Sequence, residues 1–353
     1  MSRFINQRVG NLKPYTPGEQ PKEREYIKLN TNESPFPPST LAIELATAQS
    51  QKLHLYPDPD CKELTAAVAK ACGVNSENVI LTNGSDEVLN FAFMAYCSKD
   101  KPAYFPDITY GFYKVFADVN GVPYREIPLK DDFSINIDDY DNLDGVIFIA
   151  NPNAPTGKVL PLLDVERLLK ANPNRIVVID QAYIDFGGES AIKLIDKYDN
   201  LLVTETFSKS RSMAGARLGY GVASKEIIKD LNTVKYSTNP YNVNRMSAAA
   251  GLGAITEQAY FKDKCKKIIE NREYTESQLI KLGFTLDKSN ANFTFAKSDK
   301  IGGKQLYLRL KEKGILVRHF DSDRIKDYIR ITIGSMEQMK IFIKKVKEIL
   351  EKI

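Results

Sequence analysis

Three long apolar runs, separated by polar and helical stretches, constrain the fold of this sequence most. They read DGVIFIA in residues 144–150, RIVVID in 175–180 and NLLVTET in 200–206. Continuous apolar runs of this kind are typical of strands buried on both faces, which occur in parallel sheets that helices cover. Because helical patterns alternate with the runs, the sequence predicts an α/β fold in which a mainly parallel sheet carries helices on both faces.

Polar residues suited to chemistry follow two of these runs. Asp180 ends the second run, Tyr183 comes three residues later, and Lys209 follows the third run. Ligands of open α/β sheets bind at the carboxyl ends of the strands, so we expect these side chains to share one site. A lysine there, followed by small residues and Arg217, suits a covalent aldehyde cofactor that carries a phosphate. Taken alone, the segment also allows a lysine that merely ends a strand.

A second candidate phosphate site lies in residues 78–97, which predict a short buried strand, a turn with glycine and a helix. Such a junction directs backbone N–H groups and the positive end of the helix at a ligand above the strand. Ser85 is placed to cap this helix and to contact a phosphate, whereas Asp86 and Glu87 suit the helix dipole. Tyr110 follows the next strand, where its ring could stack on a planar cofactor or belong to the core.

The composition argues against several classes of protein. The 49 basic and 45 acidic residues are interspersed and leave a net charge of +4, which does not favour a nucleic-acid surface. No apolar run approaches the roughly 18 residues of a membrane span, so we expect a cytoplasmic protein that does not enter the membrane. The four cysteines are scattered and there are two histidines, too few for a Cys/His metal cluster.

Pattern and composition divide the chain into three regions. Residues 1–45 are rich in proline and predict an extended arm and the start of a small domain. Residues 46–275 carry the strands and helices of a large domain, and residues 276–353 predict a small α+β domain. Tyr15 and Asn32 are the candidate functional residues of the arm, although each also fits a simple turn.

Ordered motifs along the chain resemble those of one known family. GSDE, NPNAPTG, Asp180 with Tyr183, and SK followed by AGARLGY are similar in order and spacing to fold-type-I pyridoxal-phosphate-dependent aminotransferases. PYTPG, LNTNESPF, LYPDPD, TYGFY, GILVR and YIRITIG make the chain most similar to the histidinol-phosphate aminotransferases, over nearly its whole length. The resemblance implies pyridoxal 5′-phosphate as cofactor, a large domain with a mainly parallel seven-stranded sheet, and a small α+β domain.

The reaction that this resemblance implies is transamination between L-histidinol phosphate and 2-oxoglutarate, which gives imidazole-acetol phosphate and L-glutamate in histidine biosynthesis. Three alternatives stay open. An L-threonine-O-3-phosphate decarboxylase and an aromatic amino acid aminotransferase share the fold and the cofactor motifs. A non-catalytic, cofactor-sensing regulator also shares the fold. Such a regulator generally carries a DNA-binding module, and we expect no spare N-terminal domain of that kind here.

The resemblance also implies roles at the cofactor. Lys209 would bind it covalently and move a proton, Asp180 would pair with its pyridine nitrogen, and Tyr183 would hydrogen-bond its phenolic oxygen. The cofactor-binding residues implied in full are Ser85, Asp86, Tyr110, Asn153, Asp180, Tyr183, Thr206, Ser208, Lys209 and Arg217, with Tyr56 reaching over from the neighbouring subunit of a homodimer.

Substrate recognition would depend on anionic groups. Arg330 in YIRITIG would bind the phosphate of histidinol phosphate and the α-carboxylate of glutamate in turn, and Arg318 in GILVR would make a second phosphate contact. The planar fork of donors on arginine suits such groups better than an ammonium does. Tyr15 would add a phosphate contact from the arm, and Asn32 would lie near the substrate.

One motif departs from the family pattern. Many relatives have two asparagines before PTG, and the second faces the phenolic oxygen of the cofactor, whereas this chain has Ala154 at that position. Asn153 could replace the contact from the preceding position. Otherwise Tyr183 would carry more of the tuning of the cofactor, and Tyr183→Phe should then cause a large loss of activity.

Overall fold

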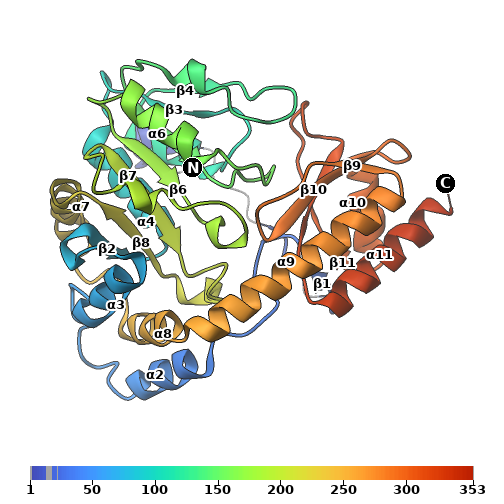
Figure 1. Cartoon of the computed structure of the whole chain (residues 1–353), viewed down its shortest axis with the longest axis horizontal. Helices are drawn as coiled ribbons and strands as arrows, with labels where there is room; N and C mark the ends of the chain where they lie inside the picture. Colours follow the sequence, from blue (N-terminus) through green and yellow to red (C-terminus); the bar gives the residue numbers. More distant parts are fainter. Residues whose placement is uncertain (1, 13–17, 22, 353) are drawn as a thin grey trace.

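The computed structural model describes residues 2–12, 18–21 and 23–352 and shows two lobes of unequal size (Figure 1). The large lobe is built around a seven-stranded sheet, and the small lobe contains a four-stranded and a two-stranded sheet. The 24-residue helix α9 (Gln258–Lys281) runs from the large lobe to the small one. The boundary that we expected between residues 275 and 276 therefore falls inside a continuous helix.

The central sheet confirms the mainly parallel, seven-stranded arrangement. In spatial order its strands are β2 (Val79–Thr82), β8 (Gly219–Ala223), β7 (Leu201–Thr206), β6 (Val177–Asp180), β5 (Val146–Ala150), β3 (Ala103–Pro106) and β4 (Tyr124–Ile127). Among these seven strands, β8 alone runs in the direction opposite to the other six. Asp180 pairs with Ala150 on one side and Thr204 on the other, so the carboxyl ends of three strands meet at one edge.

Helices cover both faces of this sheet. On one face lie α4 (Ser85–Tyr96), α5 (Phe112–Asn120) and α7 (Lys225–Thr238), and on the other α3 (Lys62–Cys72), α6 (Leu162–Ala171) and α8 (Arg245–Thr256). Phe148 of β5 is buried in the first core, whereas Ile147 and Ile149 are buried in the second. Successive residues of one strand thus face opposite cores, which explains the unbroken apolar runs of the sequence. Helix α2 (Thr40–Ser50) packs outside α8.

The small lobe combines segments from both ends of the chain. Its antiparallel sheet has the order β12 (Arg318–His319), β13 (Tyr328–Thr332), β10 (Phe293–Ser298) and β9 (Phe284–Leu286), and β1 (Ile27–Lys28) pairs with β11 (Ile315–Leu316). Helices α10 (Gly303–Glu312) and α11 (Met336–Leu350) share its core with α9, and a short helix α1 (Gln7–Gly10) begins the chain. None of the described helices is long and apolar enough to cross a membrane.

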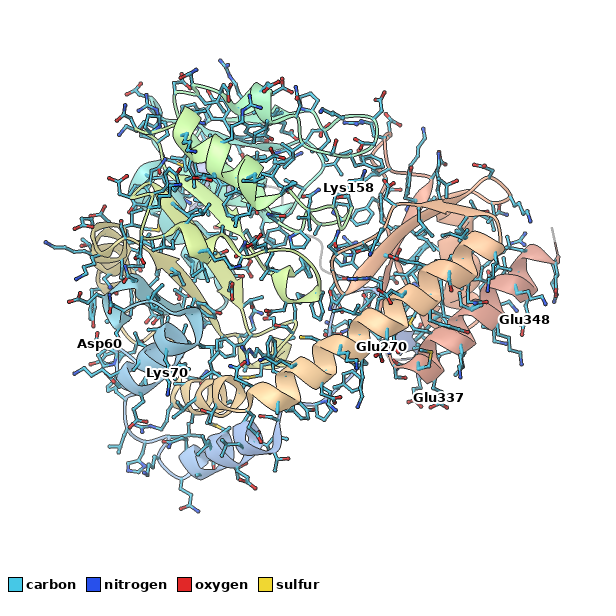
Figure 2. All side chains as sticks on the ribbon, viewed as in Figure 1. Asp60, Lys70, Lys158, Glu270, Glu337 and Glu348 are labelled. Carbon is cyan, nitrogen blue, oxygen red and sulfur yellow. The ribbon has the colours of Figure 1, made fainter. Side chains whose placement is uncertain are left out.

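Polar contacts join the two lobes at several points. Lys158, labelled near the junction in Figure 2, lies 3.2 Å from carboxylate oxygens of both Asp132 in the large lobe and Asp287 in the small lobe. On the same side, Arg324 pairs with Asp107 at 2.7 Å. These ion pairs are partly exposed, so each contributes little to stability, and they are among several contacts that join the two lobes.

Candidate functional site

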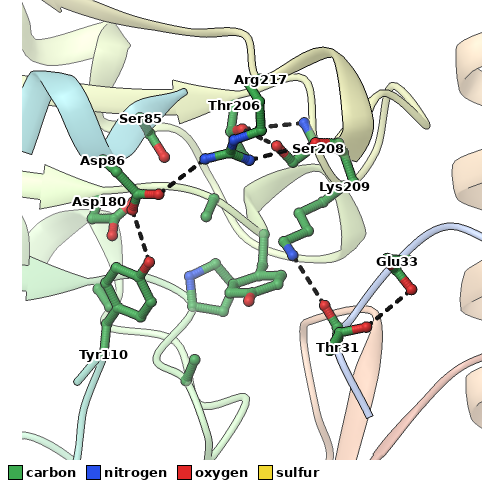
Figure 3. A pocket seen from close by; sticks show the side chains of 16 residues that line it. Thr31, Glu33, Ser85, Asp86, Tyr110, Asp180, Thr206, Ser208, Lys209 and Arg217 are labelled. Atoms are coloured by element: carbon green, nitrogen blue, oxygen red, sulfur yellow. Dashed lines mark hydrogen bonds and ion pairs between the residues drawn. The ribbon is translucent and has the colours of Figure 1, made fainter. Parts of the chain in front are cut away.

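A cavity of about 280 Å³ opens at the carboxyl edge of the central strands, beside the small lobe (Figure 3). Nine residues predicted from the sequence line it: Ser85, Asp86, Tyr110, Asp180, Tyr183, Thr206, Ser208, Lys209 and Arg217. The remaining lining residues are Thr31, Glu33, Ala150, Pro152, Ala154, Ala182 and Ala214. The edge of the parallel strands therefore collects the chemically capable side chains in one place, as their positions after the strands predicted.

Asp180 ends β6 at the bottom of this cavity and is 5% exposed. Its carboxylate accepts hydrogen bonds from Tyr113 Oη at 3.0 Å and Thr204 Oγ1 at 3.1 Å. Burial nevertheless raises the pKa of the Asp180 carboxyl to about 6, because two neutral hydroxyls do not offset the loss of hydration. A cation beside this carboxylate would restore its charged form.

Neither hydroxyl that holds Asp180 was predicted from the sequence. Thr204 lies directly opposite Asp180 in the register of β7 with β6, which only the strand pairing reveals. Tyr113 lies in the first turn of α5 and Tyr110 just before that helix, and the Tyr113 N–H donates to Tyr110 O at 3.2 Å, so their nearness in the chain could have indicated a shared role. The two tyrosines do lie edge to face, with ring centroids 5.7 Å apart.

Lys209 extends into the cavity from the turn that follows β7. Its Nζ donates to the backbone carbonyl of Thr31 at 3.3 Å and lies 5.8 Å from the centre of the Tyr183 ring. Figure 3 shows the ammonium pointing from the large lobe toward the segment that carries Thr31 and Glu33. The Lys209 amine thus enters the cavity from the end of a strand of the large lobe, and the carbonyl that accepts its hydrogen bond belongs to the small lobe.

Tyr183 stands between these groups. Its ring packs edge-on against Phe293 at 5.1 Å, and its hydroxyl accepts a hydrogen bond from Asn32 Nδ2 at 3.0 Å. Asn32 itself is buried and does not line the cavity. The sequence predicted that Asn32 would contribute to the site, but not that it would contact Tyr183.

The first turn of α4 forms an anion seat. Gly84, at the N-cap, offers no side-chain cap to the N–H groups of this turn, and Ser85 is its first residue. A Cβ on Gly219 would lie 2.3 Å from Ser85 N, so glycine lets β8 approach the helix closely. The guanidinium of Arg217 lies beside the turn, where it pairs with Asp86 at 3.1 Å. Helix dipole, free N–H groups and guanidinium all favour a phosphate here.

Hydroxyls complete this seat and a ring faces it. Thr206 Oγ1 donates to Ser208 Oγ at 3.0 Å, and both side chains line the cavity beside Arg217. Tyr110 donates from its hydroxyl to Asp86 Oδ1 at 2.7 Å, which leaves its ring along the cavity wall in Figure 3. The donors converge on one end of the cavity, and Asp180 and Lys209 lie beyond them.

These residues fit pyridoxal 5′-phosphate. The seat of helix N-terminus, hydroxyls and Arg217 suits its phosphate, and Lys209 offers a primary amine for its aldehyde. Asp180, whose pKa is raised by burial, lacks the positive partner that a protonated pyridine nitrogen would provide. The described residues include no group of three or more His, Cys, Asp or Glu side chains that could hold a metal ion.

The two predicted substrate arginines lie together in the small lobe. Arg318 of β12 pairs directly with Arg330 of β13 in the antiparallel register. Their guanidinium groups lie 5.8 and 5.7 Å from the centre of the same Phe320 ring. Arg330 Nη2 also donates to the backbone carbonyl of Asn30 at 3.0 Å, next in the chain to Thr31, which lines the cavity together with Glu33.

Tyr56 and Asn153 lie outside the cavity lining. The Tyr56 ring is 78% exposed and stacks on Tyr241, with ring centroids 4.6 Å apart. The Asn153 amide donates to Ile108 O at 2.9 Å and to Thr156, so its side chain is directed away from the cavity, and Ala154 lines the wall instead. The structure thus does not bring Asn153 to the position that Ala154 leaves open. Tyr15 lies outside the described residues.

Comparisons with known proteins agree along the whole chain. A family model described as aminotransferase class I and II matches residues 24–346. The chain is 50% identical to the histidinol-phosphate aminotransferase of Brachyspira hyodysenteriae over 353 residues, covering 99% of this chain and 100% of that protein. It is 46% identical to the Clostridium beijerinckii protein of the same name over 351 residues, covering 99% and 98%.

A solved structure shares the fold. The histidinol-phosphate aminotransferase from Sinorhizobium meliloti, in complex with pyridoxal 5′-phosphate, superposes with a TM-score of 0.90, covering 100% of this chain and 99% of that one. Its sequence identity is 21%, so this likeness bears on the fold alone. The two lobes and the sheet with one reversed strand are therefore an arrangement that a pyridoxal-phosphate protein also adopts.

Proposed function

The chain belongs to the class I and II aminotransferases, and we propose that it catalyses pyridoxal-phosphate-dependent transamination between L-histidinol phosphate and 2-oxoglutarate. The products are imidazole-acetol phosphate and L-glutamate, and the reaction is a step of histidine biosynthesis. The full-length identity to histidinol-phosphate aminotransferases supports this specific reaction over others of the same fold.

Pyridoxal 5′-phosphate, when bound, supplies an aldehyde for amines and a conjugated ring that takes up the electron pair left on the substrate carbon. Ser85, Thr206, Ser208 and Arg217 would hold its phosphate, aided by the first N–H groups of α4. Tyr110 would lie along its ring. The seat on α4 and β8 fixes one end of the site, so the position of the reacting atoms depends on the fold rather than on a mobile loop.

Three side chains then do the proton chemistry. Lys209 Nζ would hold the cofactor and, as the amine at the carboxyl edge of the strands, would move the proton that leaves the amine-bearing carbon of the substrate. Asp180 would hold a positive charge at the ring nitrogen of the cofactor, because a carboxylate so deeply buried gains most from a cation beside it. Tyr183 would donate a hydrogen bond from its hydroxyl to the phenolic oxygen of the cofactor and so lower the basicity of that oxygen.

The arginine pair carries the choice of an anionic substrate. Arg318 and Arg330 lie directly opposite each other across β12 and β13, so one anion could accept hydrogen bonds from both guanidinium groups. The phosphate of histidinol phosphate lies on the carbon next to its amine-bearing carbon, as the α-carboxylate of glutamate does. Arg330 can therefore serve both substrates in turn, with Arg318 as a second phosphate contact.

We further propose that the active unit is a homodimer. Tyr56 is highly exposed and stacks on the exposed Tyr241, and the exposed Leu53 and Leu55 lie beside it in the chain, so apolar surface of the kind that marks protein interfaces gathers here. In a two-fold dimer its ring could reach the phosphate seat of the partner subunit. The four described cysteines are free, in keeping with the cytoplasmic location that we propose.

A panel of amine donors tests the reaction. Purified protein loaded with pyridoxal 5′-phosphate is given 2-oxoglutarate with histidinol phosphate, O-phospho-L-threonine or phenylalanine, and glutamate and carbon dioxide are measured. We expect histidinol phosphate to give the highest kcat/KM, by about 100-fold, since the arginine pair needs the phosphate. Carbon dioxide from phosphothreonine, or a preference for phenylalanine, would contradict the proposal and favour a decarboxylase or an aromatic aminotransferase.

A further inference from the structure

Asn32 makes three hydrogen bonds that tie the small lobe to Tyr183. Its side-chain Nδ2 donates to Tyr183 Oη at 3.0 Å, and its Oδ1 accepts from Thr332 Oγ1 at 3.0 Å. Its backbone N–H donates to the same Thr332 oxygen at 2.9 Å. Asn32 and Thr332 are 1% and 2% exposed, so water does not compete for these bonds. The left-handed backbone of Asn32, with a φ of 56°, is one that asparagine adopts more readily than most residues.

The direction of these bonds determines where the proton of Tyr183 points. The Thr332 oxygen accepts the backbone N–H of Asn32, so its own proton is directed to Asn32 Oδ1 and the amide N–H of Asn32 faces Tyr183. Because Tyr183 Oη accepts this N–H, its own O–H must point elsewhere. Among the described residues none accepts it, and the Tyr183 side chain lines the cavity.

We propose that Asn32 is a positioning residue, which holds Tyr183 so that the phenol donates its proton into the cavity. The inference rests on the proposed function, in which the acceptor is the phenolic oxygen of the cofactor. Asn32 then acts through Tyr183, rather than on the substrate as the family resemblance implied. Thr332 belongs to β13 of the small lobe and Tyr183 follows β6 of the large lobe, so the orientation of Tyr183 also depends on how the lobes meet.

The alanine at position 154 explains why the orientation of the Tyr183 hydroxyl matters in this chain. Ala154 packs with Ala291 and Phe293 against Tyr183 and presents a methyl group to the cavity. The neighbouring Asn153 amide is held by Ile108 and Thr156. With no amide at position 154, the phenolic oxygen depends on Tyr183, and the direction of the Tyr183 proton depends on Asn32.

The test is a pH titration of the visible absorbance of the Lys209-bound cofactor, which requires no substrate. Loss of a donor makes the phenolic oxygen more basic, so the protonated form persists to higher pH. We expect Tyr183→Phe to raise the titration midpoint by about one pH unit and Asn32→Gly by about half a unit. Glycine suits this probe because it removes the amide and tolerates a positive φ.

A double-mutant cycle separates positioning from a general structural effect. If Asn32 acts through Tyr183, Asn32→Gly should shift the midpoint in the wild type but hardly at all in Tyr183→Phe. Equal shifts in both backgrounds, or no shift in either, would overturn the proposal. Thr332→Val and Thr332→Ser form a matched pair, since only the serine keeps the hydroxyl. We expect a raised midpoint for valine and rescue by serine, and this pair decides the question if Asn32→Gly does not fold.

Ala154→Asn gives an independent arm. An amide at position 154 would supply the donor directly, so Asn32→Gly should shift the midpoint less in that background than in the wild type. An undiminished shift would contradict the role of Asn32. A protein that never develops the visible band when mixed with pyridoxal 5′-phosphate would instead refute the proposed function, so the two failures are distinguishable.

Discussion

At the residue scale, the site contains a buried carboxylate, Asp180, whose charged form destabilises the folded protein. The pKa of Asp180 is raised by burial to about 6, above its ordinary value of 3.8. The folded protein without cofactor thus binds a proton more tightly than the unfolded chain. The stabilising effect of that proton is fully present below pH 3.8 and is lost as the pH rises through about 6. Its largest contribution to the free energy of unfolding is about 3 kcal/mol. A positive charge at the ring nitrogen of the cofactor would offset this loss.

Asp180→Asn should therefore have opposite effects on the two forms of the protein. Without cofactor at pH 7.5, we expect the melting temperature to rise, by the equivalent of about 1–2 kcal/mol, because a buried charge is removed. Affinity for pyridoxal 5′-phosphate should fall at least about tenfold, because the ring nitrogen loses its partner. Thermal scans at pH 5 and 7.5 and cofactor titrations measure both effects.

Asp144→Asn is the matched control. Asp144 accepts a hydrogen bond from Tyr104 at the surface, which lowers the pKa of its carboxyl. The same chemical change there should not stabilise the protein at neutral pH or alter cofactor affinity. If Asp180→Asn behaved like Asp144→Asn, burial of Asp180 would not be the source of its altered pKa.

The site residues that the sequence predicted differ from the others in how they are positioned. Lys209, Asp180 and Arg217 were found because they follow strands or turns in an order that the chain itself displays. Thr204 and Asn32 hold Asp180 and Tyr183 through contacts across strands and lobes, which no local pattern encodes. Asn153 was proposed from its neighbour in sequence, but the loop directs its amide to Ile108.

At the element scale, the meeting of β8 with the first turn of α4 creates the anion seat. A Cβ on Gly219 would lie 2.3 Å from Ser85 N and 2.5 Å from Gly84 C, both backbone atoms that cannot move aside cheaply. The alternation of strands and helices was predictable from the apolar runs. The reversal of β8 and this close approach were not, because they depend on how two elements distant in sequence pack.

Gly219→Ala should separate the strand from the helix. We expect destabilisation by about 1–3 kcal/mol and a clear loss of pyridoxal 5′-phosphate affinity, read from a thermal scan and a cofactor titration. Gly215→Ala in the same segment is the control, since no atom lies within 4 Å of its added Cβ. Equal behaviour of the two variants would show that the close approach does not shape the seat.

The β12–β13 pair supports a prediction about anions. If phosphate binds between Arg318 and Arg330, inorganic phosphate should raise the melting temperature of the protein, and Arg318→Gln should abolish most of that gain. Lys304→Gln is the control for net charge, because Lys304 is an exposed cation of α10. A gain that survives Arg318→Gln but disappears with Lys304→Gln would place phosphate elsewhere.

At the scale of the whole molecule, we propose that a complete active site needs two subunits. Tyr56 stacks on Tyr241 at the surface of the large lobe, outside the cavity of its own chain. If its ring completes the site of a partner subunit, Tyr56→Ala and Lys209→Ala damage different halves of each site. A mixed dimer of the two variants then contains one intact site.

Mixing the variants tests this directly. Each variant alone should be nearly inactive, whereas refolding an equal mixture should restore about a quarter of the wild-type activity, because half of the dimers are mixed and each has one intact site. The wild type refolded by the same procedure is the reference. No recovery from a mixture shown to contain mixed dimers would mean that Tyr56 acts within its own chain or not at all.

A single half-reaction on cofactor-loaded protein distinguishes transamination of histidinol phosphate from the other reactions of this fold. Histidinol phosphate is added without any keto acid while the visible absorbance of the bound cofactor is recorded. We expect the band to disappear as imidazole-acetol phosphate forms in an amount equal to the sites, and 2-oxoglutarate to restore it with release of glutamate. An unchanged spectrum, in protein that carries the cofactor, would show that histidinol phosphate is not an amino donor for this protein.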